Sequence, residues 1–229
     1  MLRRLIFVAL ALAATTPPSI AGEAMIGTVS INLPPPPGFC DMADTDPDKS
    51  LVKNLTDLSA TQGVKLLKMS ADCQQLAAWR TGTGKLLDDF LQYQTPAALI
   101  DTQVSGPPEE TTKRSCAELR AQGEKALADR LPGMKANVEN IIKEVKLNET
   151  TFAGVLAEEP NACYAALISK IRTALGTDKT QVTLIALTII KGKNVYMYRT
   201  AVNLTPDTIN AVLAKSKIDL AALLAANRN

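Results

Sequence analysis

The strongest hydrophobic pattern in the chain is a pair of apolar runs within residues 181–203. The runs are joined by a short polar segment, residues 191–194, that contains a glycine, which predicts a β-hairpin. Because side chains alternate along a strand, the first run divides into two sets that face opposite ways. One set contains Val182, Leu184, Ala186, Thr188 and Ile190, and the other contains Thr183, Ile185, Leu187 and Ile189. Both sets are mostly apolar, so we predict an α+β fold in which this hairpin is the centre of an antiparallel sheet sandwiched by helices.

Shorter alternating segments predict further strands. Residues 27–33 alternate with period two and end at a run of prolines, which cannot donate to a β-ladder. Residues 64–71 predict a second strand, and residues 90–94 predict a third that ends at Pro96. Residues 163–171 fit both strand and helix periods, and we interpret them as a strand because two turn clusters flank them.

Helical periodicity is clearest after residue 107. Pro108 and the acidic residues behind it are typical of a helix start, and Pro132 with Gly133 predicts a break between two helices, 108–131 and 134–147. At the C terminus Thr205 is expected to cap a helix that begins at Pro206. A separate last helix is expected after Ser216 and Lys217. The apolar stripe of this region is expected to cover one face of the sheet.

Three aspartates, Asp44, Asp46 and Asp48, have the spacing of the first ligands of a calcium loop. The sixth position of such a loop is Lys49 instead of Gly, and the twelfth is Leu55 instead of Glu. Helix capping is the favoured interpretation: Asp46 as N-cap, followed by Pro47 and by Asp48 in the first turn of a helix to about residue 59. A weak cation site is the alternative.

The N terminus has the pattern of a secretory signal peptide. Arg3 and Arg4 precede an apolar run that is too short to span a bilayer, and small residues follow at Ser19 and Ala21. We expect cleavage after Ala21, with Ala24 as the second choice. This predicts a periplasmic or secreted domain of residues 22–229, with no stable membrane span after cleavage.

Removal of the signal also changes the net charge. Two of the 25 Lys and Arg residues are Arg3 and Arg4, so the mature chain keeps 23 positive side chains against 23 negative ones. A neutral chain gives no reason to expect nucleic acid or an anionic membrane as partner.

All four cysteines, Cys40, Cys73, Cys116 and Cys163, lie in the exported part. An even number of cysteines in an oxidising compartment favours two disulfides, for which three connectivities exist. We prefer Cys40 with Cys73 and Cys116 with Cys163, because each pair closes a moderate loop between neighbouring elements. A structural metal is not expected, since the cysteines are far apart and the chain contains no histidine.

The absence of histidine removes the commonest catalytic base and excludes Ser-His-Asp and Cys-His nucleophile systems. Asp88 and Asp89 could be considered as an acid and base pair. Adjacent residues on a strand face opposite ways, however, so we expect them in a solvated loop or at a strand start. We therefore expect no enzymatic activity and no cofactor.

The order of elements resembles the exported α/β sandwich of the PsbP and DcrB type. Residues 29–39 (VSINLPPPPGF), the hairpin within residues 182–202 and the closing helix from Pro206 carry the resemblance. The four cysteines and the long helical region from residue 108 to 147 are not part of that pattern. The resemblance implies a non-enzymatic accessory or binding factor.

Three functions follow from these observations. The first is an accessory protein that binds a protein or another component of the cell envelope. The second is a carrier of a small molecule or cell-wall ligand, whose pocket would use the aromatic residues Trp79, Phe90, Tyr93, Tyr196 and Tyr198, although ordinary core packing also explains them. The third is a hydrolase based on carboxylates, which would need two such groups facing each other in a cleft.

Overall fold

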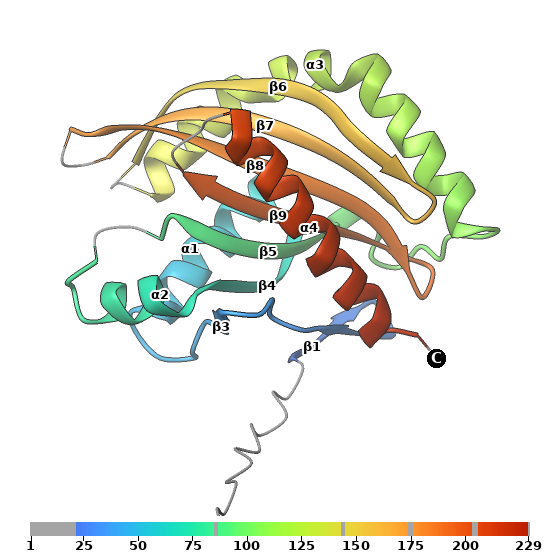
Figure 1. Ribbon diagram of the computed structural model, residues 1–229, viewed down its shortest axis with the longest axis horizontal. Helices are drawn as coiled ribbons and strands as arrows, with labels where there is room; N and C mark the ends of the chain where they lie inside the picture. Colours follow the sequence, from blue (N-terminus) through green and yellow to red (C-terminus); the bar gives the residue numbers. More distant parts are fainter. Residues whose placement is uncertain (1–21, 85–86, 143–144, 174–175, 203–205, 229) are drawn as a thin grey trace, which may run out of the picture.

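An antiparallel sheet forms the middle layer of the protein (Figure 1). The computed structural model describes residues 22–84, 87–142, 145–173, 176–202 and 206–228. Within this part of the chain seven strands pair side by side. In spatial order they are β3 (Phe39–Asp41), β4 (Val64–Asp72), β5 (Asp89–Pro96), β9 (Lys193–Val202), β8 (Asp178–Ile190), β7 (Ala162–Thr173) and β6 (Val145–Glu159).

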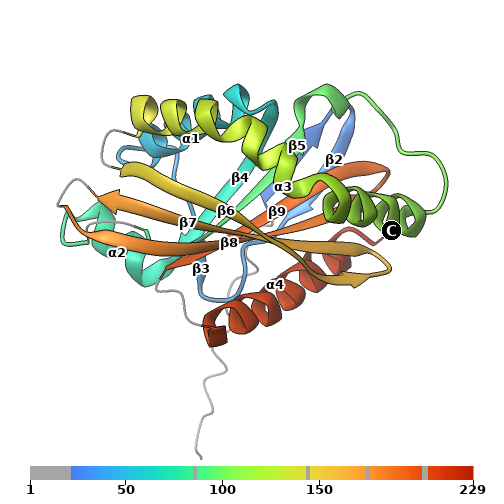
Figure 2. The same cartoon turned by 90° about the horizontal axis from the view of Figure 1, so that it is seen from above.

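Helices cover both faces of this sheet, as Figure 2 shows. Helices α1 (Asp48–Thr61) and α3 (Pro108–Ile141) lie over one face, which we call the cavity face. Helix α4 (Pro206–Ala226) lies over the other, which we call the α4 face. A separate hairpin of β1 (Gly22–Ile26) and β2 (Val29–Leu33) shares the core beneath α4, and the short helices α2 (Cys73–Arg80) and η1 (Ala97–Leu99) lie next to β4 and β5 in sequence.

The predicted hairpin is confirmed as β8 and β9, and it lies in the middle of the sheet. Its turn is shorter than predicted, because Lys193 and Asn194 already pair with Ile190 and Ile189. The two turn residues, Lys191 and Gly192, both have positive φ, at 49° and 74°, as a two-residue hairpin turn requires. Lys193 is buried in β9, and its ammonium group donates to the backbone carbonyls of Ile100 and Thr102, which compensates for the loss of water.

The alternation predicted for residues 182–190 is also confirmed. The first set of side chains is buried, and the second set is partly exposed on the opposite face. The buried set joins one hydrophobic core with β1, β2 and α4 on the α4 face. The core includes the fully buried side chains Ile26, Ile31, Leu33, Leu91, Leu184, Met197, Leu220 and Leu223.

A buried ion pair ties α4 to the sheet. The guanidinium group of Arg199 on β9 donates to Asp219 on α4 and, more weakly, to Asp89 at the start of β5, 3.4 Å away. The same group lies 4.7 Å from the ring centre of Phe39. Burial raises the pKa of Asp219 above its usual range, and the nearby Arg199 opposes that shift.

Two predicted helix breaks are wrong. The helices predicted at 108–131 and 134–147 form a single helix, α3, with Pro132 inside it. Pro132 is exposed, so the helix loses one hydrogen bond without burying an unpaired carbonyl, and Figure 2 shows it bending as it crosses the sheet. At the C terminus the predicted pair of helices is one helix, α4, because Ser216 and Asp219 face the sheet instead of ending the helix. The expected cap, Thr205, lies outside the described residues.

Two strand boundaries also differ from the prediction. Val145 and Leu147 were expected on a helix but begin the edge strand β6. The pairing of β6 with β7 shifts register at three places, so the strand has no simple period of two in the sequence. The strand predicted at 27–33 is confirmed from Val29 onward as β2, but Gly27 occupies a turn with φ 60° that joins β2 to β1. The strands predicted at 64–71, 90–94 and 163–171 are confirmed as β4, β5 and β7.

Both preferred disulfides are confirmed. Cys40 on β3 is bonded to Cys73 at the start of α2, and Cys116 on α3 is bonded to Cys163 on β7. The second bond holds α3 against the sheet, next to Gly123, where an added methyl group would lie 2.5 Å from the ring of Phe152 on β6. α3 can therefore approach β6 closely only because this residue has no side chain.

Candidate functional site

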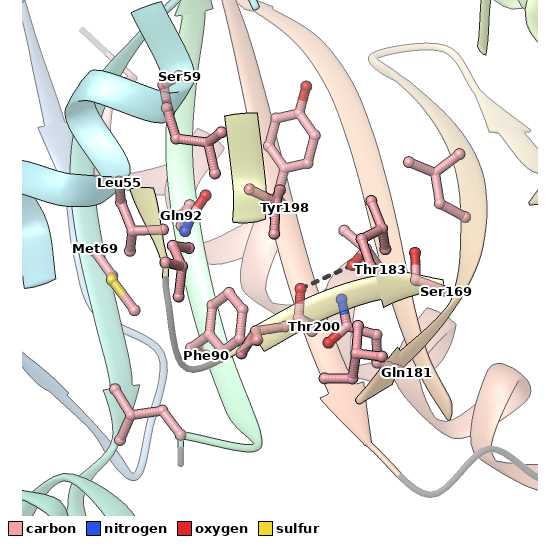
Figure 3. A pocket seen from close by; sticks show the side chains of 18 of the residues that line it. Leu55, Ser59, Met69, Phe90, Gln92, Ser169, Gln181, Thr183, Tyr198 and Thr200 are labelled. Atoms are coloured by element: carbon pink, nitrogen blue, oxygen red, sulfur yellow. Dashed lines mark hydrogen bonds between the residues drawn. The ribbon is translucent and has the colours of Figure 1, made fainter. Parts of the chain in front are cut away.

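A cavity of about 320 Å³ lies between the sheet and the helices on the cavity face. Met69 of β4 and Val145 and Leu147 of β6 line its two edges, and most of its floor is built from side chains at alternate positions of the four strands between them. These are Phe90, Gln92 and Gln94 of β5, Tyr198, Thr200 and Val202 of β9, Gln181 and Thr183 of β8, and Leu167, Ser169 and Ile171 of β7. Figure 3 shows several of these side chains in a row across the strands.

The roof of the cavity is mostly apolar, although Ser59 and Gln62 at the C-terminal end of α1 also line it. Leu51, Leu55 and Leu58 of α1 cover one end, and Met134 and Val138 of α3 cover the other. These residues recur at three- and four-residue spacing, so one stripe of each helix faces the cavity. The described lining residues thus combine a mixed polar and apolar floor with a mostly aliphatic roof.

The polar groups of the floor are uncharged and partly paired with one another. Gln94 donates through Nε2 to Oε1 of Gln92 at 2.9 Å, and the hydroxyl groups of Thr183 and Thr200 lie 3.0 Å apart (Figure 3). The hydroxyl group of Ser169 lies 3.0 Å from that of Thr150 on β6. These pairs fix the side chains, and each pair keeps free hydrogen-bonding capacity for a bound molecule.

One charged side chain, Asp88, is found among the described residues that line the cavity. Both of its carboxylate oxygens accept from the ammonium group of Lys179 at 2.8 Å. The side-chain amide oxygen of Gln75 on α2 accepts from the backbone N–H groups of Asp88 and Asp89. Asp88 is therefore both positioned and neutralised by its neighbours.

The two adjacent aspartates face opposite ways, as expected for a strand start. Asp88 lies on the cavity face and pairs with Lys179, whereas Asp89 approaches Arg199 on the α4 face. Neither is a freely solvated group, since their side chains are 35% and 25% exposed. They cannot act together on one substrate.

The aspartates considered as a cation site each have a different partner. Asp44 pairs with Lys49, and Asp46 accepts from the backbone and the hydroxyl group of Ser50. The helix begins at Asp48, one residue later than a helix capped by Asp46 would, although the side chain of Asp46 still bonds its first turn. Among the described residues no group of three or more acidic or cysteine side chains is arranged to hold a metal ion.

Asp48 is almost fully buried and forms an ion pair with Arg80 at the end of α2. Its carboxylate also accepts from the backbone N–H of Ala43 at 2.7 Å. The hydrogen bonds from Arg80 lower the pKa of Asp48 below its usual range. This pair fastens the start of the roof helix α1.

The five aromatic residues predicted for a pocket separate into three groups. Trp79, Phe90 and Tyr198 line the cavity. Tyr93 points to the α4 face, where it is buried and donates to the carbonyl of Pro34 at 3.0 Å. Tyr196 lies beside a much smaller space of about 10 Å³ near the start of α3. Burial raises the pKa of Tyr198 above its usual range.

The polar floor was not predicted from the sequence. Its signal is the alternation of Gln92 and Gln94 with Leu91 and Tyr93 within one strand. Such alternation is also the pattern of a strand with one solvated face. Only the position of α1 and α3 over that face distinguishes the two cases.

No family model matches the chain, and no curated protein matches it. Among the described residues no helix has the length and apolar character needed to cross a bilayer.

Proposed function

We propose that this chain is an exported, non-enzymatic binding protein of the cell envelope that holds a small molecule in the cavity between the sheet and the helices α1 and α3. The single observation that carries the proposal is the cavity of about 320 Å³, whose lining includes Trp79, Phe90 and Tyr198. Its size is in the range of small-molecule sites, and its lining has the expected form, mostly apolar with a few placed polar groups.

Two features favour a carrier over the other functions considered. The hydrolase needs two carboxylates across a cleft, and Asp88, already paired with Lys179, is the one carboxylate among the described lining residues. A flat docking surface would need a contiguous apolar patch. The exposed large hydrophobic side chains in the described part are Met25 and Ile218, which lie on the separate elements β1 and α4.

The architecture and compartment belong to the same proposal. A sheet with helices on both faces is compatible with a sandwich of the PsbP and DcrB type, in which accessory and binding roles are usual. Two disulfides favour an oxidising compartment outside the cytoplasm. The expected signal peptide, residues 1–21, lies outside the described residues.

The test is to recover the bound molecule. The full-length chain is exported in its own host, purified from the envelope fraction without detergent, and weighed by native mass spectrometry before and after denaturation. A bound molecule adds a mass that is lost on denaturation. The variant Val138→Phe places a ring in the cavity from α3 and is expected to lose this mass.

The matched control is Ala136→Phe, which adds the same ring to the exposed side of α3. It should keep the bound molecule. The proposal is wrong if the purified protein carries no added mass, or if Val138→Phe retains the mass as fully as Ala136→Phe does.

A further inference from the structure

The cavity is extended across the strands. Its lining residues come from β4 at one side, through β5, β9, β8 and β7, to β6 at the other. Five spacings between neighbouring strands correspond to roughly 24 Å. A volume of about 320 Å³ distributed over that width describes a narrow channel, which fits a linear molecule better than a compact ring system.

The electrostatic character of the channel excludes charged ligands. Its one charged lining residue in the described part, Asp88, is paired with Lys179 at 2.8 Å. A ligand carboxylate or ammonium group would therefore enter without a free counter-charge and would lose its hydration, which is costly.

The hydrogen-bonding groups of the floor have unused capacity. The amide NH₂ of Gln92 is not engaged by its bond to Gln94, in which Gln92 is the acceptor. The side-chain amide of Gln181 has no hydrogen bond within the described residues. Amides offer both donors and acceptors, which match a hydroxyl, amide or ester group.

We infer that the channel binds an uncharged amphiphile, a single hydrocarbon chain with a hydroxyl, amide or ester head. The hydrocarbon lies against the aliphatic residues of α1 and α3, and the head forms hydrogen bonds with the side-chain amides of Gln92 and Gln181. This inference rests on the proposed function, because it specifies the ligand of the same cavity.

The test compares three probes of equal length at pH 7: decan-1-ol below its solubility limit, and decanoate and decylammonium below their micelle concentrations. Trp79, the one tryptophan in the chain, lines the cavity, so its fluorescence reports binding directly. Decan-1-ol is expected to bind about tenfold more tightly than either ion, because neither ion finds an unpaired opposite charge. Equal or tighter binding of an ion overturns the inference.

A charge introduced into the floor should change the order of affinities. In Gln181→Lys the new ammonium group faces the channel, so decanoate is expected to become the tightest of the three probes. The control Gln74→Lys places the same charge on the exposed side of α2 and should leave decan-1-ol the tightest. If Gln181→Lys still prefers decan-1-ol while retaining a cooperative thermal transition, the inference is wrong.

Failure of the inference differs from failure of the proposed function. A molecule recovered from the wild-type protein that carries a net charge at pH 7 overturns the inference and keeps the binding role. Absence of any recovered molecule, together with no fluorescence response to any of the three probes, overturns both.

Discussion

The two faces of the sheet are built from the same strands but are packed differently. On the α4 face the side chains of β8 and β9 interlock with α4 and with the β1–β2 hairpin, and many of them are completely buried. On the cavity face the next residues along the same strands line a cavity under α1 and α3.

This difference assigns separate tasks to the two faces. Dense packing of large aliphatic groups is the main source of folding stability. A preformed cavity loses those contacts, so the cavity face contributes less stability and retains space for a ligand. The helices over it are fastened by other means: the Cys116–Cys163 disulfide on α3 and the Asp48–Arg80 ion pair on α1.

The largest expected effect comes from the buried ion pair of the α4 face. Arg199→Met leaves Asp219 and Asp89 without their cation, and it should lower the free energy of unfolding by about 4 kcal/mol. The double variant Arg199→Met with Asp219→Leu should recover at least half of the loss, as measured by urea denaturation. Arg172→Met, in the exposed pair with Asp178, is the control and should cost less than about 0.5 kcal/mol.

The second prediction compares one substitution on both faces. Leu184→Ala opens a hole in the closed core of the α4 face and should cost about 3 kcal/mol of unfolding free energy. Leu167→Ala enlarges a space that already exists on the cavity face and should cost about 1.5 kcal/mol, because fewer contacts are lost. Equal losses in chemical denaturation would contradict the contrast between the two faces.

The third prediction concerns pH. Arg80 lowers the pKa of Asp48 in the folded state, so this group contributes stability above its unfolded pKa of about 4, and the contribution is lost as the pH falls through the folded pKa. Asp48→Asn should therefore cost about 2 kcal/mol at pH 7 and almost nothing at low pH.

The contribution of Asp219, on the α4 face, to folding stability changes with pH in the opposite direction to that of Asp48. Its pKa is raised by burial, so its contribution is complete below the unfolded pKa and decreases as the pH rises through the folded pKa.

Urea denaturation of the wild type and Asp48→Asn between pH 3 and 7 checks the prediction for Asp48. If the difference in unfolding free energy between the two proteins is the same at the lowest pH as at pH 7, the Asp48–Arg80 ion pair is not the source of that difference.

The smallest effect is expected when side chains are enlarged on the cavity face. Val138→Phe should change the free energy of unfolding by less than about 0.5 kcal/mol, because the ring enters existing space. Ala186→Leu on the α4 face should cost about 2 kcal/mol, because no space exists there. Thermal unfolding measures both, and a large loss in Val138→Phe would mean that the cavity cannot admit a ring.

Strong local patterns were sufficient to predict much of the fold. The period-two alternation from Val182 to Ile190 predicted the central strand and both of its faces. The spacing of cysteines between neighbouring elements favoured the two disulfides that are present. Pro132 and Ser216 misled the prediction, because a residue that breaks a helix locally can be tolerated when tertiary contacts support both sides. Gly27 misled it in the opposite way, because it was expected inside a strand and lies in a turn.

The sequence by itself determined the alternation of the central strands and the absence of histidine chemistry, and it favoured the two covalent links between elements. The tertiary structure decided which alternating face is filled and which is hollow. Gln92 and Thr183 have the same pattern in a solvated strand as in a roofed one. The distance at which α1 and α3 cross the sheet is set by contacts between residues far apart in the chain, such as Gly123 with Phe152 and Cys116 with Cys163. No local pattern encodes that distance, and the cavity depends on it.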